Sequence, residues 1–263
     1  VSRCWDTTTD ALHRTLRSVQ QQSHGAFKAI VVGHERPPFM DKFQPNIRFV
    51  GLTTPAPVLK TAREFATDNR RFTRDKNSKI LRGMQALNEH NITHWFTLDA
   101  DDLLCSNFVD TLAHDGCEHG AVVDGGYLVY PRQRRFITCS ELSQYCGSTS
   151  VLADKHLNIA PDATEPEKVD CPWFRYPHTK MHTYFQDELN TSYTTFSEPL
   201  IGYVLGHGDN CSDGYRDTLI SRCVANSSHG SREDESMTVL HNTLLCSPSA
   251  NAVAEQRKQP CSV

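Results

Sequence analysis

Apolar residues recur at the spacing of a helix near the start of the chain, in residues 10–22. Three of them lie three or four positions apart and share one face: Leu12, Leu16 and Val19. Thr7 and Asp10 precede this stripe with the spacing of a capping box, and Gly25 follows it. The pattern therefore predicts an amphipathic helix whose apolar face turns inward.

Two further segments have the pattern of helices. In residues 75–91 the apolar stripe is formed by Ile80, Met84 and Leu87 and widened by Leu81 and Ala86. A shorter helix is predicted after residue 107, where Ser106 and Asn107 can cap it and three apolar side chains face inward: Phe108, Val109 and Leu112.

Short apolar runs bounded by polar residues predict strands at residues 47–51, 95–98, 121–124 and 126–130. Residues 36–78 contain five prolines, and only one strand, at residues 47–51, is predicted in this segment. The order helix, strand, acidic loop, helix across residues 75–112 is the layout of an open α/β sheet. In such sheets, ligands bind beyond the carboxyl ends of the strands.

Three carboxylates, Asp99, Asp101 and Asp102, follow directly after the predicted strand at 95–98. Such close acids repel one another unless a cation or a solvated turn relieves them. Hard divalent ions prefer carboxylate oxygens, so the cluster is a candidate metal site. A polar surface turn is the alternative. An EF-hand loop is disfavoured because Leu103 and Leu104 occupy positions that need a ligand and a glycine.

Composition narrows the class of protein. The 263 residues carry a formal net charge of −4, which gives no basic footprint for nucleic acid. No run approaches the roughly 18 apolar residues of a membrane span. The ten cysteines include no Cys-x-x-Cys pair. We expect a cytoplasmic protein without an integral membrane segment, either free or peripheral to a membrane; four glycosylation sequons leave the secretory pathway open.

The centre of the chain resembles a family-2-like glycosyltransferase with the GT-A fold. The resemblance is carried by residues 79–83, by the Asp-x-Asp element within residues 96–104, and by residues 107–110. Residues 10–22 are similar to the family's first helix, and residues 27–35 to its second strand. The resemblance covers roughly residues 3–130. It implies a Rossmann-like α/β fold with a mixed, mostly parallel sheet flanked by helices. We expect one domain over 1–263, with a nucleotide-sugar-binding half (1–130) and an acceptor-binding half with a C-terminal tail (131–263).

The resemblance also implies a metal site. In that family, the Asp-x-Asp element holds a divalent ion, Mn²⁺ or Mg²⁺, against the diphosphate of a sugar nucleotide. Asp99 and Asp101 occupy these positions, with Asp101 expected to contact the metal directly and Asp102 to share part of that role. His207 lies between two glycines after an apolar run and is the candidate third ligand. A polar loop histidine is the alternative interpretation of His207.

The remaining site residues are expected around the donor and the acceptor. The nucleoside site is placed at Arg3, His34 and Glu35, while Lys79 would contact phosphate or base. Residues 63–79 are rich in Arg and Lys, which indicates either a solvated face or a seat for the diphosphate. Residues 147–150 would line the donor sugar or the acceptor, or form a plain turn.

Asp187 and Glu188 are the candidate catalytic bases, because a hydroxyl acceptor must lose its proton as it attacks. The family carries a similar acidic pair in the reverse order. Adjacent helical residues point about 100° apart, so only one can face the sugar, and Asp187 is preferred. A solvent-facing pair is the alternative.

These inferences predict a metal-dependent enzyme that moves a sugar from a nucleoside-diphosphate sugar to a hydroxyl of a glycan acceptor, of the surface or capsular polysaccharide type. The resemblance implies inversion by single displacement, and retention stays open. A nucleotidyltransferase is disfavoured because residues 1–10 lack a Gly-rich basic loop. The other alternative is a non-catalytic glycan- or nucleotide-sugar-binding domain that retains the fold.

Overall fold

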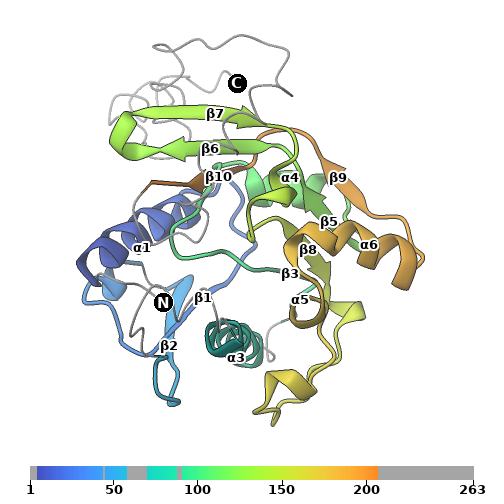
Figure 1. Ribbon diagram of the computed structural model, residues 1–263, viewed down its shortest axis with the longest axis horizontal. Helices are drawn as coiled ribbons and strands as arrows, with labels where there is room; N and C mark the ends of the chain where they lie inside the picture. Colours follow the sequence, from blue (N-terminus) through green and yellow to red (C-terminus); the bar gives the residue numbers. More distant parts are fainter. Residues whose placement is uncertain (1–4, 44, 58–69, 88–90, 207–263) are drawn as a thin grey trace, which may run out of the picture.

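The structure is a computed structural model that describes residues 5–43, 45–57, 70–87 and 91–206. Within these residues the chain forms a mixed α/β protein (Figure 1). Its longer helices are α1 (Trp5–Gln20), α3 (Arg70–Leu87) and α4 (Phe108–His114). Shorter turns of helix fill the second half: α5 (Pro172–Arg175), α6 (Met181–Thr183), the π-helix η7 (Tyr184–Glu188), and 3₁₀ segments that include η3 (Leu142–Gln144) and η6 (His178–Lys180).

The three predicted helices are present. In α1, Leu16 and Val19 are buried and Leu12 packs against the same core. In α3, Leu81, Met84 and Leu87 are buried on one face, as the apolar stripe predicts. The expected cap of α4 is wrong, because Asn107 makes no side-chain cap hydrogen bond. Its backbone has φ −91° and ψ 3°, outside the extended region from which a cap side chain reaches the first amides.

The strands in the described part of the chain form three small sheets. β1 (Ala29–Gly33) and β2 (Ile47–Gly51) make a parallel pair. A second sheet has the order β4–β10–β6–β7, whose bounds are Leu103–Leu104, Ile201–Val204, Gly126–Tyr130 and Arg135–Cys139. A third has the order β3–β8–β5–β9, whose bounds are His94–Phe96, Ser150–Ala153, Gly120–Val123 and Thr194–Phe196.

The prediction of a mostly parallel sheet is wrong. Among the described strands, four pairings are antiparallel and three are parallel. β6 and β7 are joined only by residues 131–134, and a parallel pair would need a crossover of about a dozen residues or more. β8 lies between β3 and β5 and runs against both of them.

The third sheet determines where the functional side chains lie. β3 and β5 are both antiparallel to β8, and β9 is parallel to β5. Hence β3, β5 and β9 all run the same way, and their carboxyl ends meet the amino end of β8 at one edge. Asp99 follows β3, Asp124 follows β5, and Ser148 precedes β8, so that edge collects all three side chains.

Two apolar clusters support this edge. The larger one joins the inner face of α1 to the sheets and includes Met40, Leu128, Tyr130, Leu142 and Ile201. The smaller one packs α6 and η7 onto the third sheet through five buried side chains: Val122, Leu152, Met181, Tyr184 and Phe185. In the described residues, no helix is long and apolar enough to cross a membrane.

Candidate functional site

The acidic loop is a tight turn, closed where the Asp102 amide donates to the Asp99 carbonyl at 3.2 Å. α1 fixes its other side. The Thr15 hydroxyl lies 3.0 Å from the Ala100 carbonyl, and the Leu104 amide donates to Ser18 Oγ at 3.1 Å. Thr15 and Ser18 are both buried, so these polar contacts are shielded from water. The turn is therefore anchored to the first helix as well as to its own strand.

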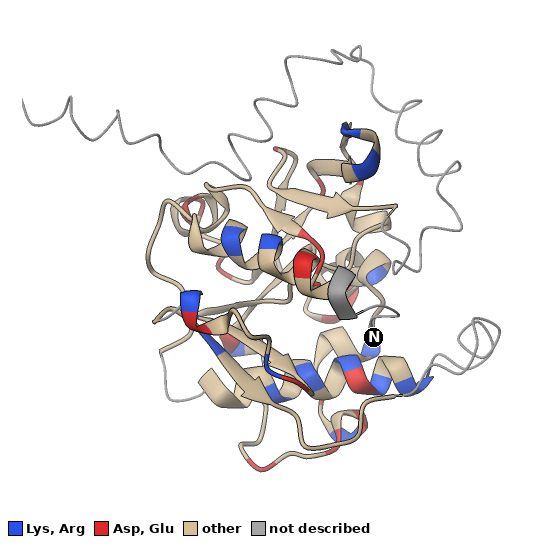
Figure 2. Ribbon diagram, turned by 90° about the vertical axis from the view of Figure 1, so that its left-hand side faces the viewer, with Lys and Arg blue, Asp and Glu red and all other residues tan. Residues whose placement is uncertain are grey.

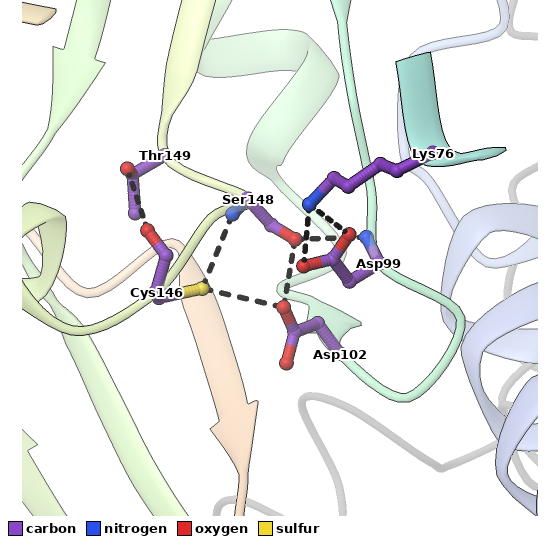
Figure 3. A network of polar contacts seen from close by, with 6 residues as sticks. All are labelled: Lys76, Asp99, Asp102, Cys146, Ser148 and Thr149. Atoms are coloured by element: carbon purple, nitrogen blue, oxygen red, sulfur yellow. Dashed lines mark hydrogen bonds and ion pairs between the residues drawn. The ribbon is translucent and has the colours of Figure 1, made fainter. Parts of the chain in front are cut away.

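Asp99 forms an ion pair with Lys76 on α3 (Figure 3). Lys76 Nζ donates to Asp99 Oδ1 at 2.8 Å and to Oδ2 at 3.1 Å. The side chains remain 50% and 40% exposed, so a ligand from solvent can reach both. Asp99 raises the pKa of the Lys76 ammonium. Burial acts to raise the pKa of the Asp99 carboxyl, but the charge and hydrogen bond of Lys76 outweigh it, and the net shift is downward.

Gly147 lies directly against this ion pair. A Cβ atom at this position would stand 3.0 Å from Asp99 Oδ2 and 3.3 Å from Lys76 Nζ. Both distances are tighter than ordinary van der Waals contact. Because Gly147 has no side chain, it provides the space that the Lys76–Asp99 ion pair occupies. Of residues 147–150, Gly147 and Ser148 lie against the acidic turn, and their contact with a donor sugar or acceptor stays a prediction.

Asp102 is fully buried, in contrast to Asp99. Its Oδ2 accepts from Ser148 Oγ at 2.7 Å and from the Cys146 thiol at 3.2 Å, while the Val204 amide lies 3.4 Å from Oδ1. Burial, followed by the charges of Asp101 and Asp99, raises the pKa of the Asp102 carboxyl well above its usual range. Asp102 was expected to share in metal binding, but these hydrogen bonds occupy its carboxylate oxygens. We call Lys76, Asp99, Asp102 and Ser148 the acidic-turn site.

A second charged group on α3 faces β1. Asp75 is buried, and its two oxygens contact His34 Nε2 at 2.7 Å and Lys79 Nζ at 2.6 Å. Lys79 is thus bound to Asp75, four residues earlier on the same helix face. His34 lies just past the carboxyl end of β1, and its Nδ1 is buried without a hydrogen-bond partner in the structure. α3 therefore connects His34 to the acidic turn, because Asp75 and Lys76 are neighbours.

His178 on η6 also belongs to this region. Burial, followed by the charge of Lys76, lowers the pKa of its imidazole, and the charge of Asp99 opposes that shift. Sequence reasoning missed His178 and the roles of Lys76 and Ser148. Lys76 belonged to the basic run, but nothing in that run distinguishes it from its neighbours. His178 carries no local motif, since only the fold brings it near Asp99.

The predicted bases lie on η7. Glu188 accepts hydrogen bonds from Tyr176 at 2.5 Å and from Arg175 at 3.2 Å. The hydrogen bonds from Arg175 and then Tyr176 lower the pKa of Glu188. Asp187 beside it is exposed. We call Arg175, Tyr176 and Glu188 the outer carboxylate cluster.

The other predicted site residues fall in different places. Arg3 and His207 lie outside the described residues. Glu35 is exposed after β1, whereas Asp101 is partly buried within the acidic turn. Along the described ribbon in Figure 2, Lys and Arg positions lie among Asp and Glu positions.

The described residues fit a divalent cation in part. Among them, no group of three His, Cys, Asp or Glu side chains is placed to hold a metal ion. Asp99 and Asp101 nevertheless bring two carboxylates to one partly exposed turn. Mg²⁺ is commonly bound by one or two carboxylates together with substrate phosphates. The donor set therefore suits a cation that arrives with a phosphorylated ligand.

Comparisons with known proteins give a structural likeness alone. Neither a known protein family nor a curated protein matches the sequence. Among solved structures, the chain is similar to the crystal structure of S. aureus TarS 1-349, with a TM-score of 0.44 and 12% identity. The match covers 85% of this chain and 64% of the TarS chain, so this chain spans less than two thirds of that structure.

Proposed function

We propose that the protein is a glycosyltransferase that moves a sugar from a nucleoside-diphosphate sugar to a hydroxyl of a glycan acceptor. The observation that supports this most strongly is the Lys76–Asp99 ion pair at a strand end, 2.8 Å long and half exposed. α3 links this pair to His34 at the end of β1. Lys76 on α3, and the partly buried imidazole of His34 that Asp75 of the same helix holds, suit a ligand with a phosphate end and a nucleoside end.

Lys76 would receive the diphosphate. An ammonium group has three N–H donors, and Asp99 engages it through both carboxylate oxygens without covering it. When the sugar leaves, its former diphosphate partner gains negative charge. A cation that is already held in place stabilises that charge without reorganising during the reaction. The raised pKa of Lys76 keeps it charged over the neutral range.

A divalent ion, Mn²⁺ or Mg²⁺, is proposed at Asp99 and Asp101, with His207 as the third ligand. When bound, it would neutralise further charge on the departing diphosphate. Asp99 would then have two partners, Lys76 and the ion. The Asp99 side chain is 40% accessible, so an ion from solvent can reach it beside Lys76.

The nucleoside is proposed to lie at His34 and Glu35, with Arg3 beside it. In the tautomer whose Nε2–H donates to Asp75, Nδ1 of His34 is an acceptor. That nitrogen is buried and unpaired in the structure, and a hydrogen bond from a base or ribose would satisfy it. Lys79 is proposed to act indirectly here, since it holds the second oxygen of Asp75.

Inversion by single displacement needs a base on the acceptor side. The base takes the hydroxyl proton while the new C–O bond forms and the bond to the diphosphate breaks. Asp187 is the proposed base. Glu188 is the weaker candidate because Arg175 and Tyr176 stabilise its charged form and lower its pKa.

The alternative is a nucleotide-sugar-binding domain without catalysis. The outer carboxylate cluster favours it, because one of the two predicted bases is already committed to Arg175 and Tyr176. The proposal and the alternative agree on donor binding and differ on turnover.

The experiment is an incubation of the protein with UDP-, GDP-, CDP- and dTDP-sugars, with and without Mn²⁺, while the released nucleoside diphosphate is quantified. We expect release from one donor class, faster with Mn²⁺ and faster again with a glycan acceptor. Binding without release, in protein whose fold is confirmed by circular dichroism, would favour the non-catalytic alternative.

A further inference from the structure

A closed ring of polar contacts joins the acidic turn to residues 146–148, and Figure 3 shows the contacts that Ser148 makes in it. The Asp99 amide donates to Ser148 Oγ at 2.8 Å, and the Ser148 hydroxyl donates to Asp102 Oδ2 at 2.7 Å. The Asp102 amide then donates back to the Asp99 carbonyl at 3.2 Å. Ser148 thus uses its one hydroxyl both as a donor and as an acceptor, and it connects the two aspartates.

This ring is buried and braced on a second side. Asp102 and Ser148 have no exposed surface. The Cys146 thiol donates to the same Asp102 oxygen at 3.2 Å and accepts from the Ser148 amide at 3.3 Å. Away from water, each of these groups is costly to leave unpaired, so a satisfied network of this kind holds one geometry.

The ring controls the part of the acidic turn that solvent can reach. Ser148 fixes the backbone of Asp99, and the Asp99 side chain leaves that backbone toward Lys76. Gly147, one residue before Ser148, lies against both members of the ion pair. A movement of Ser148 would therefore shift the Asp99 carboxylate and the space beside it together.

We propose that Asp102 is a positioning residue that acts through Ser148 to hold Asp99 and Lys76 in the orientation that receives an anionic ligand. Asp102 does not touch the ligand itself, because it has no exposed surface. The identity of the ligand as a nucleoside diphosphate rests on the proposed function. The positioning of Lys76 does not rest on it.

The test is the acetylation rate of Lys76, measured by mass spectrometry after brief treatment with an N-hydroxysuccinimide ester. While it donates to both Asp99 oxygens, at 2.8 and 3.1 Å, the amine is shielded from the ester, and release of that ion pair exposes it. Lys168 is the internal standard, since it is well exposed and paired with Glu165. The variants are Ser148→Ala and Asp102→Asn. Asp102→Ala is avoided because it removes the acceptor of the buried Ser148 hydroxyl and Cys146 thiol and threatens folding.

A matched control comes from Ser143, another buried serine whose hydroxyl donates to a carboxylate, that of Asp124. Ser143→Ala removes a hydrogen bond of the same kind outside the ring. Its loss of stability should resemble that of Ser148→Ala. Only a variant that releases Asp99 should change the labelling of Lys76.

We expect Ser148→Ala to raise the Lys76 rate about fivefold relative to Lys168, the effect of losing about one buried hydrogen bond. Asp102→Asn should give a smaller rise because its amide oxygen can still accept from Ser148, and Ser143→Ala should give none. Unchanged Lys76 labelling in folded Ser148→Ala and Asp102→Asn would overturn the proposal, as would an equal rise in Ser143→Ala. No nucleotide is present in this assay, so its result is independent of whether the proposed function holds.

Discussion

The acidic-turn site and the outer carboxylate cluster both pair carboxylates with cations, yet they are built differently. Asp99 meets Lys76 beside the fully buried, hydrogen-bonded side chains of Asp102 and Ser148. Glu188 meets Arg175 and Tyr176 on exposed surface between short helical turns. Exposed ion pairs typically contribute about 0–1 kcal/mol to stability. Both carboxylates have a cation beside them, so the cation does not distinguish the two regions. The difference is that buried hydrogen bonds fix the position of Asp99, which is what a preorganised binding site needs.

The largest expected difference is in the rate of sugar transfer after substitution of the two neighbouring acids on η7, Asp187 and Glu188. Asp187→Asn should reduce sugar transfer by about a hundredfold or more, because a general base contributes on that scale. Glu188→Gln should retain transfer and lower the unfolding free energy by less than about 1 kcal/mol. Initial rates and chemical denaturation measure the two effects. Equal losses of transfer in both variants would contradict the assignment of Asp187 as the only base of the pair. Full activity in Asp187→Asn would show that Asp187 is not the base.

Gly147 offers a smaller and more local change at the acidic-turn site. Gly147→Ala places a Cβ 3.0 Å from Asp99 Oδ2, so the ion pair must shift. We expect nucleotide affinity to fall about tenfold, which corresponds to about 1.4 kcal/mol.

Gly25→Ala is the matched control for this change, because a Cβ at Gly25 meets no atom within 4 Å. Calorimetric dissociation constants for the two variants and the wild type make the comparison. Undiminished affinity in Gly147→Ala would mean that the ligand does not use the space beside the ion pair.

The smallest expected effect concerns two buried thiols outside both regions. Burial raises the pKa of Cys105 to about 12 and that of Cys171 to about 11. Only the thiolate reacts, so its fraction at pH 8 is minute and rises only as pH approaches those values. Iodoacetamide at pH 8 should leave both unmodified in the native protein and modify both after denaturation. Rapid native labelling would show that these side chains are accessible.

Local patterns predicted the local parts of this fold. The strands at 47–51 and 126–130 lie where the apolar runs placed them, and α1 buries Leu16 and Val19 as its spacing required. The direction of β8 was beyond such patterns, because strand pairing depends on contacts distant in the sequence.

In the candidate site too, features local in the sequence could be predicted and contacts between distant segments could not. The three acids were visible because they are adjacent in sequence. Helix geometry then separates the basic residues: Lys79 shares a face with Asp75, four residues away, whereas Lys76 reaches the acidic turn. Ser148 could not be assigned to the two aspartates, because only the pairing of β8 with β3 brings it there.

The most direct test of the account is calorimetric titration with UDP, GDP, CDP and dTDP, each with and without Mn²⁺. The proteins compared are the wild type, Lys76→Met, Asp101→Ala and the control Lys168→Met, whose lysine is exposed and paired with Glu165. The account predicts that one nucleotide binds the wild type and the control equally, more tightly with Mn²⁺. Asp101→Ala should lose the Mn²⁺ dependence, and Lys76→Met should bind at least about tenfold more weakly. Absence of binding by any nucleotide to the folded wild type, or equal affinity in Lys76→Met, would contradict it.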